Sequence, residues 1–155
     1  MNQKFTKNFF RPLLLLLTLI IAADGFAQFP QIYYVRPNGD DGNMGTSWAT
    51  PFKSIQKALA VASDGARIFV EKGTYYVDEG FQAIDNIRTS TITLKNGVSL
   101  YGGFDPEFGI DGLEDIRTSK SRLSGDLKKD DYLGDAFFQD NAFHVVTSTS
   151  VGETT

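Results

Sequence analysis

The chain has 155 residues and no cysteine, and its 15 Lys and Arg against 19 Asp and Glu give a formal net charge of −4. The lack of cysteine excludes disulfides and cysteine-ligated metal sites, so stability must come from burial and backbone hydrogen bonding. The acidic balance argues against a nucleic-acid partner, because neutralising phosphates requires clustered Lys and Arg.

Residues 1–27 have the pattern of an export signal. Three basic residues precede an apolar run from Leu13 to Ala23, and small residues at Gly25 and Ala27 predict cleavage before Gln28. A membrane anchor is the alternative, but this run is well short of the roughly 20 residues that span a bilayer. Without the signal the chain keeps 12 Lys and Arg against 18 Asp and Glu. We therefore expect an exported protein, extracellular or at the outer-membrane surface, with no transmembrane segment after signal removal.

Residues 28–65 predict a strand, a loop and a helix. The strand is Ile32–Val35, and the loop from Pro37 to Gly45 is rich in turn-forming residues. A helix is expected over Pro51–Ser63, since Thr50 suits the N-cap position and Pro51 the first helical position. Its predicted buried stripe consists of Phe52, Ile55, Leu59 and Ala62. By itself this helix fits either a cap on a coil of strands or a surface helix of a two-layer α+β domain.

Residues 66–155 predict a series of short strands rich in β-branched and aromatic residues. They lie at Arg67–Val70, Thr91–Leu94, Val98–Tyr101, Arg122–Ser124 and Phe143–Thr147. Four of these strands start at residues 67, 98, 122 and 143, a spacing expected for successive turns of a β-solenoid. Residues 77–90 would then be a loop excursion from one turn. A β-sandwich would show closer spacing and more hairpin turns. Between Lys95 and Val98, Asn96-Gly97 suits either a hairpin turn or a corner between two strands of one solenoid turn, and the spacing favours the corner.

Several segments together resemble the entry region of bacterial exported right-handed parallel β-helix proteins with the pectate-lyase-like fold. The resemblance rests on Tyr34-Val35, Asn38-Gly39-Asp40-Asp41-Gly42, Gly45 to Phe52, Ile55 to Leu59, Ala66 to Val70 and Gly73-Thr74-Tyr75. The following segments resemble the subgroup that includes polymorphic-outer-membrane-protein-like surface proteins: Val98 to Phe104, Arg117 and Leu123-Ser124-Gly125-Asp126. The resemblance spans Tyr34 to Val146, and it is specific for the fold but weak for function.

The resemblance implies an all-β fold, a right-handed parallel β-helix with one N-terminal capping helix. The last predicted strand is followed by a polar tail without a cap, so we also expect the chain to be the front end of a longer protein. The expected function is a non-catalytic structural or adhesin-like surface module. One alternative is a polysaccharide lyase or glycoside hydrolase whose active site lies beyond this chain. The other is a carbohydrate-binding module, and either would have a polysaccharide or a cell-surface glycan as its partner.

Candidate site residues are few. Oxygen ligands of the kind that Ca²⁺ prefers are concentrated at Asn38, Asp40, Asp41 and Asn43, and Ca²⁺ is the one cofactor suggested. Turn formation is the alternative explanation of the same residues. Tyr101, Phe104 and Phe108 could stack on sugar rings, although such aromatic residues also fill solenoid turns. The single histidine, His144, has no partner at a recognised spacing, and Ser124-Gly125-Asp126 lacks the setting of a nucleophile elbow. The sequence therefore predicts no catalytic set.

Overall fold

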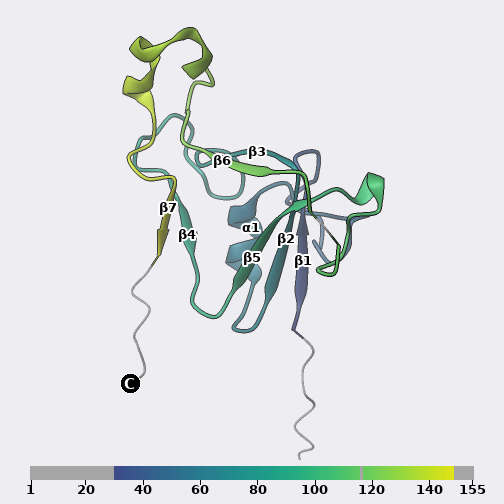
Figure 1. The fold of residues 1–155 in the computed structure, drawn as a ribbon. Helices are drawn as coiled ribbons and strands as arrows, with labels where there is room; N and C mark the ends of the chain where they lie inside the picture. The colour runs from purple at the N-terminus through teal and green to yellow at the C-terminus, as the bar shows by residue number, and fades with distance from the viewer. Residues whose placement is uncertain (1–29, 116, 149–155) are drawn as a thin grey trace, which may run out of the picture.

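The computed structural model describes residues 30–115 and 117–148, in which short strands joined by loops are the main regular elements (Figure 1). The predicted export signal, residues 1–27, lies outside the described residues. The elements in chain order are β1 (Ile32–Val35), α1 (Ile55–Val61), β2 (Arg67–Glu71), β3 (Gly73–Tyr76), β4 (Ile92–Leu94), β5 (Ser99–Phe104), η1 (Pro106–Phe108), β6 (Ser121–Ser124), η2 (Asp131–Leu133), η3 (Asp135–Asp140) and β7 (Val146–Ser148). The all-β class is confirmed. In these two ranges no helix has the length and hydrophobicity to cross a membrane.

Every pair among these strands is parallel. The strands form three sheets, in the orders β1-β2-β5, β3-β6 and β4-β7. In the first sheet Tyr34, Phe69 and Tyr101 are aligned across the three strands. Parallel neighbours cannot be joined by tight hairpins, so each pair joins segments that are distant in sequence. The prediction of strands that lie side by side and run in one direction is confirmed.

The predicted order of stacking was only partly right. β5 pairs with β2 as predicted, but β6 pairs with β3 and β7 pairs with β4, so the starts at 122 and 143 do not mark further successive turns. The cause is a corner at Lys72-Gly73, where the φ of Gly73 is +145° and the chain turns sharply from β2 into β3. The sequence analysis did not predict β3 as a strand.

The Asn96-Gly97 turn is a corner, as the spacing favoured. β4 and β5 flank this turn but belong to different sheets, so they do not form a hairpin. Gly97 has a φ of +70°, which suits a residue without a side chain. Its carbonyl accepts a hydrogen bond of 2.8 Å from the amide of Gly65, which lies in the turn before β2. The two corners are therefore stacked like the strands that follow them.

Helix α1 is shorter than the predicted range Pro51–Ser63. Phe52 is not helical, because its amide donates to Tyr34 O (2.8 Å) and its carbonyl accepts from Arg36 N (2.9 Å), which ties it to β1. Ser54 is the N-cap, and its hydroxyl accepts from Lys57 N at 3.1 Å. The predicted cap at Thr50 was thus wrong, since a long-range bridge competes with the local helix signal.

The last strand also differs from its prediction. β7 covers Val146–Ser148 rather than Phe143–Thr147. The amide of Phe143 donates instead to Arg88 O at 2.8 Å, which holds this residue outside the sheet. The predicted boundary between residues 65 and 66 stays a prediction.

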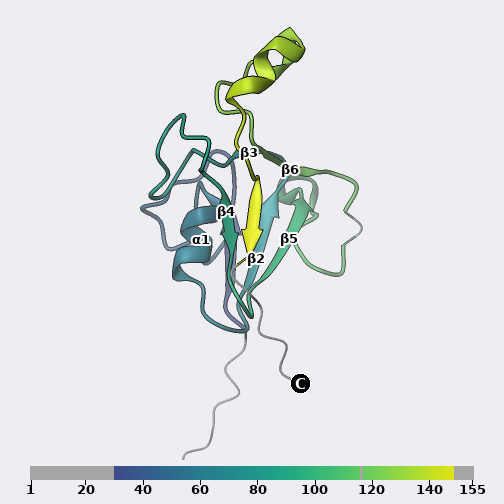
Figure 2. The same cartoon turned by 90° about the vertical axis from the view of Figure 1, so that its left-hand side faces the viewer.

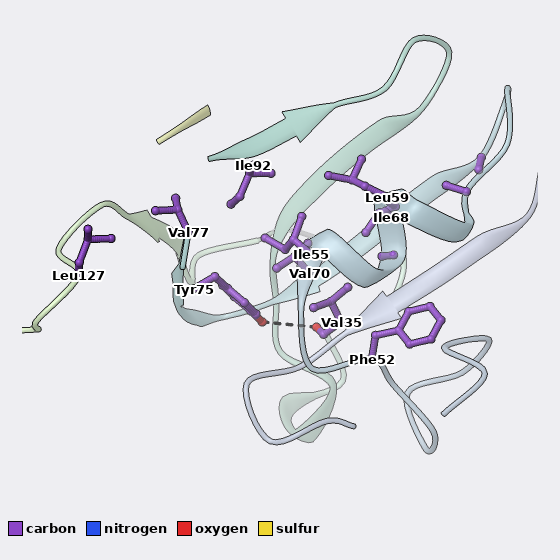
Figure 3. Close-up of a cluster of buried hydrophobic side chains, with 13 residues drawn as sticks. Val35, Phe52, Ile55, Leu59, Ile68, Val70, Tyr75, Val77, Ile92 and Leu127 are labelled. Atoms are coloured by element: carbon purple, nitrogen blue, oxygen red, sulfur yellow. Dashed lines mark hydrogen bonds between the residues drawn. The ribbon is translucent and has the colours of Figure 1, made fainter. Parts of the chain in front are cut away.

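A hydrophobic core lies between the sheets and α1 (Figure 3). It contains Val35, Phe52, Ile55, Ala58, Leu59, Ala62, Ala66, Ile68, Val70, Tyr75, Val77, Ile92 and Leu127. The Tyr75 hydroxyl lies inside this core and donates to Glu71 O (3.0 Å), with Val35 O at 3.4 Å. Burial raises the pKa of Tyr75, so the phenol stays neutral and remains a donor.

We expect Leu59→Ala to lower the free energy of unfolding by about 2–5 kcal/mol, because Leu59 is 5% exposed and its loss leaves a cavity beneath α1. Urea unfolding followed by circular dichroism measures this change. Val61→Ala is the matched control in the same helix, since Val61 is 41% exposed and should change stability little. Equal effects of the two substitutions would contradict the burial of the predicted stripe.

Candidate functional site

The acidic loop before α1 is organised around Asp41. One carboxylate oxygen accepts from Lys53 N (2.9 Å) and Ser54 N (2.8 Å), and the other accepts from the Ser54 hydroxyl (2.6 Å). These three hydrogen bonds hold the residues that lead into the helix. Asp41 therefore has a structural role in this loop.

The other predicted calcium ligands also serve the loop. Asp40 accepts from Gly42 N at 2.8 Å, and the Asn43 amide donates to Pro51 O at 2.9 Å. Asn38 is exposed. These contacts are the turn-forming role that Asn and Asp commonly have. The calcium hypothesis for Asn38, Asp40, Asp41 and Asn43 stays a prediction.

A second cluster of carboxylates lies in the segment between β6 and β7. We call this segment, residues 125–145, the arm. Asp126, Asp130 and Asp131 each have a carboxylate oxygen within 4.8 Å of the others. Asp126 accepts from the amides of Asp130 (3.1 Å) and Asp131 (3.4 Å), and Asp131 accepts from the Asn141 amide at 3.0 Å. Carboxylate and amide oxygens are the ligands that hard cations prefer, so these residues could hold such an ion.

The electrostatics of this group are unfavourable without a counter-charge. Burial raises the pKa of Asp130, and the charges of Asp140 and Asp126 raise it further. Among the described residues, no hydrogen-bond donor reaches Oδ1 of Asp130, Oδ2 of Asp140 or Oδ1 of Asn141, although Lys128 Nζ lies 3.5 Å from the Asp140 oxygen. The sequence analysis missed the group because its members are separated by up to 15 positions and meet only when the arm folds back.

The aromatic residues form a cluster on the outer face of the β1-β2-β5 sheet. Phe69 contacts Tyr34 and Tyr101 edge to face, with ring centroids 5.7 and 5.9 Å away. Trp48 packs edge to face on Tyr34 at 4.8 Å, so it lies over β1. Its indole N–H donates to Asp111 O at 3.2 Å, which links the residue 105–120 connection to this face. Burial and the charge of Asp111 raise the pKa of Tyr34.

This cluster changes the predicted set of sugar contacts. Phe104 is fully buried and stacks on Phe69 at 4.5 Å, so its ring faces cannot receive a sugar. That part of the prediction was wrong because Phe104 fills the space between Phe69 and Trp48. Tyr101 is partly exposed and Phe108 is exposed beside Lys72, whose Nζ lies 5.0 Å from its ring. Sugar contact by Tyr101 and Phe108 stays a prediction. Within this cluster, Tyr34 and Trp48 are also partly exposed, and the sequence analysis did not propose them as sugar contacts.

Ion pairs border the same face at the end of β2. Arg36 binds buried Glu71 through two nitrogens at 2.8 and 3.0 Å and also binds Glu107 at 3.0 Å. Lys72 pairs with buried Asp105 at 2.7 Å. Glu71 and Asp105 thus each have a cationic partner, which is the condition for burying a charge without a large penalty. This network connects β1, β2 and the segment after β5, and its groups are used in structural pairs.

The comparison with known protein families identifies the family of this chain. The family model described as "Protein of unknown function (DUF1565)" matches residues 37–121. The chain belongs to the DUF1565 family. This match includes α1, β2 to β5 and the aromatic cluster apart from Tyr34, while the whole arm lies beyond it.

Two individual proteins are similar to parts of this DUF1565 chain. Pectate lyase L of Dickeya dadantii (strain 3937) is 35% identical over 71 residues, which are 46% of this chain but only 16% of the lyase. The solved complex of XylC with xylose is 30% identical and covers 44% of this chain and 11% of its own, with a TM-score of 0.28. The chain therefore spans a small part of either protein.

We expect Asp130→Asn to raise the melting temperature of the DUF1565 chain at neutral pH in the presence of EDTA. A carboxyl whose pKa is raised by folding destabilises the folded state above that pKa, and the penalty disappears as the pH falls through it. The gain should therefore shrink at acidic pH. Differential scanning calorimetry at several pH values measures it, with Asp115→Asn as a control outside the group. A gain that does not depend on pH would contradict repulsion as its cause.

Proposed function

We propose that this chain is the N-terminal part of a right-handed parallel β-helix in an exported protein, and that its role is to start and cap the stack of strands. The single observation that carries the proposal is an asymmetry between the two ends of the sheets. Groups from the loop before α1 and from α1 itself bind strand edges at the end where the chain enters. At the opposite end the edges of β5, β6 and β7 have no neighbouring strand within the described residues.

The first strand is covered along its outer edge by the loop before α1. The amide of Tyr34 donates to Gly45 O at 2.8 Å, and Phe52 exchanges hydrogen bonds with Tyr34 and Arg36 on the same edge. An uncovered edge would offer unpaired N–H and C=O groups to another chain. The loop thus takes the place that a preceding strand would occupy.

Helix α1 covers the core and part of the second sheet. Its Gln56 amide nitrogen donates to Val77 O at 3.1 Å and lies 3.5 Å from Tyr76 O, at the end of β3. In the other direction, the Lys95 ammonium beside β4 donates to the Ala62 carbonyl at the end of the helix. Helix and sheets therefore satisfy groups of each other, as a cap requires.

The opposite end is suited to the addition of further parallel strands. β5, β6 and β7 follow one another and stack on β2, β3 and β4, so one more set of three strands would repeat an existing pairing. The match of this chain to 16% of a pectate lyase supports a longer protein built on the same start. A non-catalytic surface module is the favoured role, because the charged groups of the aromatic face are engaged in structural pairs.

A polysaccharide lyase is the second candidate, and the specific observation that favours it is the identity to Pectate lyase L. In that case the catalytic groove would be built by strands that follow this chain. A carbohydrate-binding role through Tyr101 and Phe108 is a further alternative, since exposed aromatic rings can stack on sugars. In all three cases the partner would be a polysaccharide or a cell-surface glycan.

We expect Gln56→Leu to lower the free energy of unfolding by about 1–3 kcal/mol, because the carbonyls of Tyr76 and Val77 lose a donor in a partly buried place. Urea unfolding measures the change. Gln31→Leu, at an exposed position before β1, is the control for adding an apolar side chain. Indistinguishable unfolding curves for both variants and the wild type would remove Gln56 from the capping proposal.

We expect the chain, produced in a bacterium with an intact export pathway, to appear outside the cytoplasm with Gln28 as its first residue, which intact-mass spectrometry determines. The exported protein should release no unsaturated product from polygalacturonate with Ca²⁺, as measured by ultraviolet absorbance. Product formation that persists after further purification would favour the lyase over the structural module. Retention of residues 1–27 would contradict export.

A further inference from the structure

The arm ends in an apolar surface that faces solvent. Tyr132 is 83% exposed and Leu133 is 54% exposed, and Phe138 on the neighbouring helix η3 is also exposed. We call these three residues the arm tip. Single exposed apolar residues are common, but three large ones close together on a projecting segment indicate a surface that contacts a partner.

The arm tip stands on a well-fixed base. Asp131 accepts two hydrogen bonds from the Asn141 amide, at 3.2 and 3.0 Å, and joins the two helices of the arm. The Arg88 guanidinium donates to Asn141 O at 2.7 Å and packs 4.3 Å from the Phe143 ring. The arm is thereby tied to the loop between β3 and β4 while its tip projects away from the sheets in both views (Figures 1 and 2). A fixed arm loses little conformational entropy when its tip is buried.

The same chain carries an apolar groove between α1 and residues 81–95. Its volume is about 610 Å³. Its apolar wall consists of Leu59, Val77, Phe81, Ile84, Ile87 and Leu94. Ile84 is 63% exposed at the mouth of the groove, and Ile87 is also exposed. A groove of this size and lining is of the kind that receives apolar side chains.

The groove and the arm differ in charge. Lys95 is the only charged residue among those that line the groove in the described part of the chain. The arm from Asp126 to Asp140 contains five Asp and two Lys. Both lysines are engaged, Lys128 with Asp140 and Lys129 with Glu79. The acidic arm is therefore locally complementary in charge to a groove whose charged lining residue is a cation.

We propose that the arm tip of one copy of this protein inserts into the groove of a second copy. Each surface lacks a partner within the described residues of its own chain, and the outward direction of the arm keeps its tip from its own groove. The contact joins two different surfaces, so every copy offers one donor and one acceptor. Such a head-to-tail contact builds open chains of molecules, or rings where the rotation closes.

Two substitutions separate the two surfaces. Leu133→Asp places a charge on the arm tip, and Ile84→Asp places one at the mouth of the groove. Both positions are exposed, so neither change should alter the melting curve of the monomer. Met44→Asp is the matched control, because Met44 is exposed and belongs to neither surface. Sedimentation velocity of the purified protein over a wide concentration range measures the assembly.

We expect the wild type and Met44→Asp to form dimers and larger species as concentration rises. Each of the two test variants alone should associate at least about tenfold more weakly than the wild type, which corresponds to a loss of about 1.4 kcal/mol in the free energy of association. An equal mixture of Leu133→Asp and Ile84→Asp should form dimers without larger species, because only one intact tip and one intact groove remain per pair. This complementation is specific to a head-to-tail contact.

The other outcomes overturn the proposal. A wild type that stays monomeric would do so directly. Self-association that Ile84→Asp leaves intact would show that the groove has another occupant, such as a glycan or an extended peptide. Failure of the mixture to dimerise, with both variants folded, would show that the tip and the groove are not each other's partners.

Discussion

The unpaired edges of parallel strands are the constraint on which the rest of the structure depends. A parallel sheet is built from segments distant in sequence, and each new strand leaves N–H and C=O groups exposed on its outer side. Here the chain covers the first edge with its own backbone, through Gly45 and Phe52 on β1. It covers the next with a side-chain amide, Gln56, at the end of β3. The acidic loop and the helix are both placed to cover these edges. Asp41 holds the two together through its hydrogen bonds to Lys53 and Ser54.

The same constraint explains what could be predicted from the sequence and what could not. The direction of the strands and the corner at Asn96-Gly97 were predictable, because spacing and turn chemistry are local properties that the printed order of residues displays. The helix start was not, because Pro51 and Thr50 are a good local start signal that a bridge between Phe52 and Val35 overrides. Strand β3 was missed because a corner of one residue, Lys72, leaves no interval in the pattern.

The candidate site shows this division more sharply. Aromatic residues near strand ends were recognised as a group, but their exposure depends on which ring fills the gap between its neighbours. Phe104 does so by stacking on Phe69, and Tyr34 and Tyr101 remain at the surface beside it. The carboxylates of the arm were not recognised as a group, since Asp126 and Asp131 are brought together by backbone turns that no periodicity announces. Side chains that converge through irregular backbone need coordinates to be found.

Two long connections leave the sheets and return to them at the same corner of the molecule. The connections from β3 to β4 and from β6 to β7 differ in length and content, yet both begin and end at paired strands. The amide of Val77 donates to Ser124 O at 3.1 Å where both connections leave, and the amide of Ile92 donates to Val145 O at 3.0 Å where both return. Closing a longer loop between fixed ends adds only a slowly growing entropic cost. The groove beside one connection and the arm on the other can therefore change without disturbing the sheets.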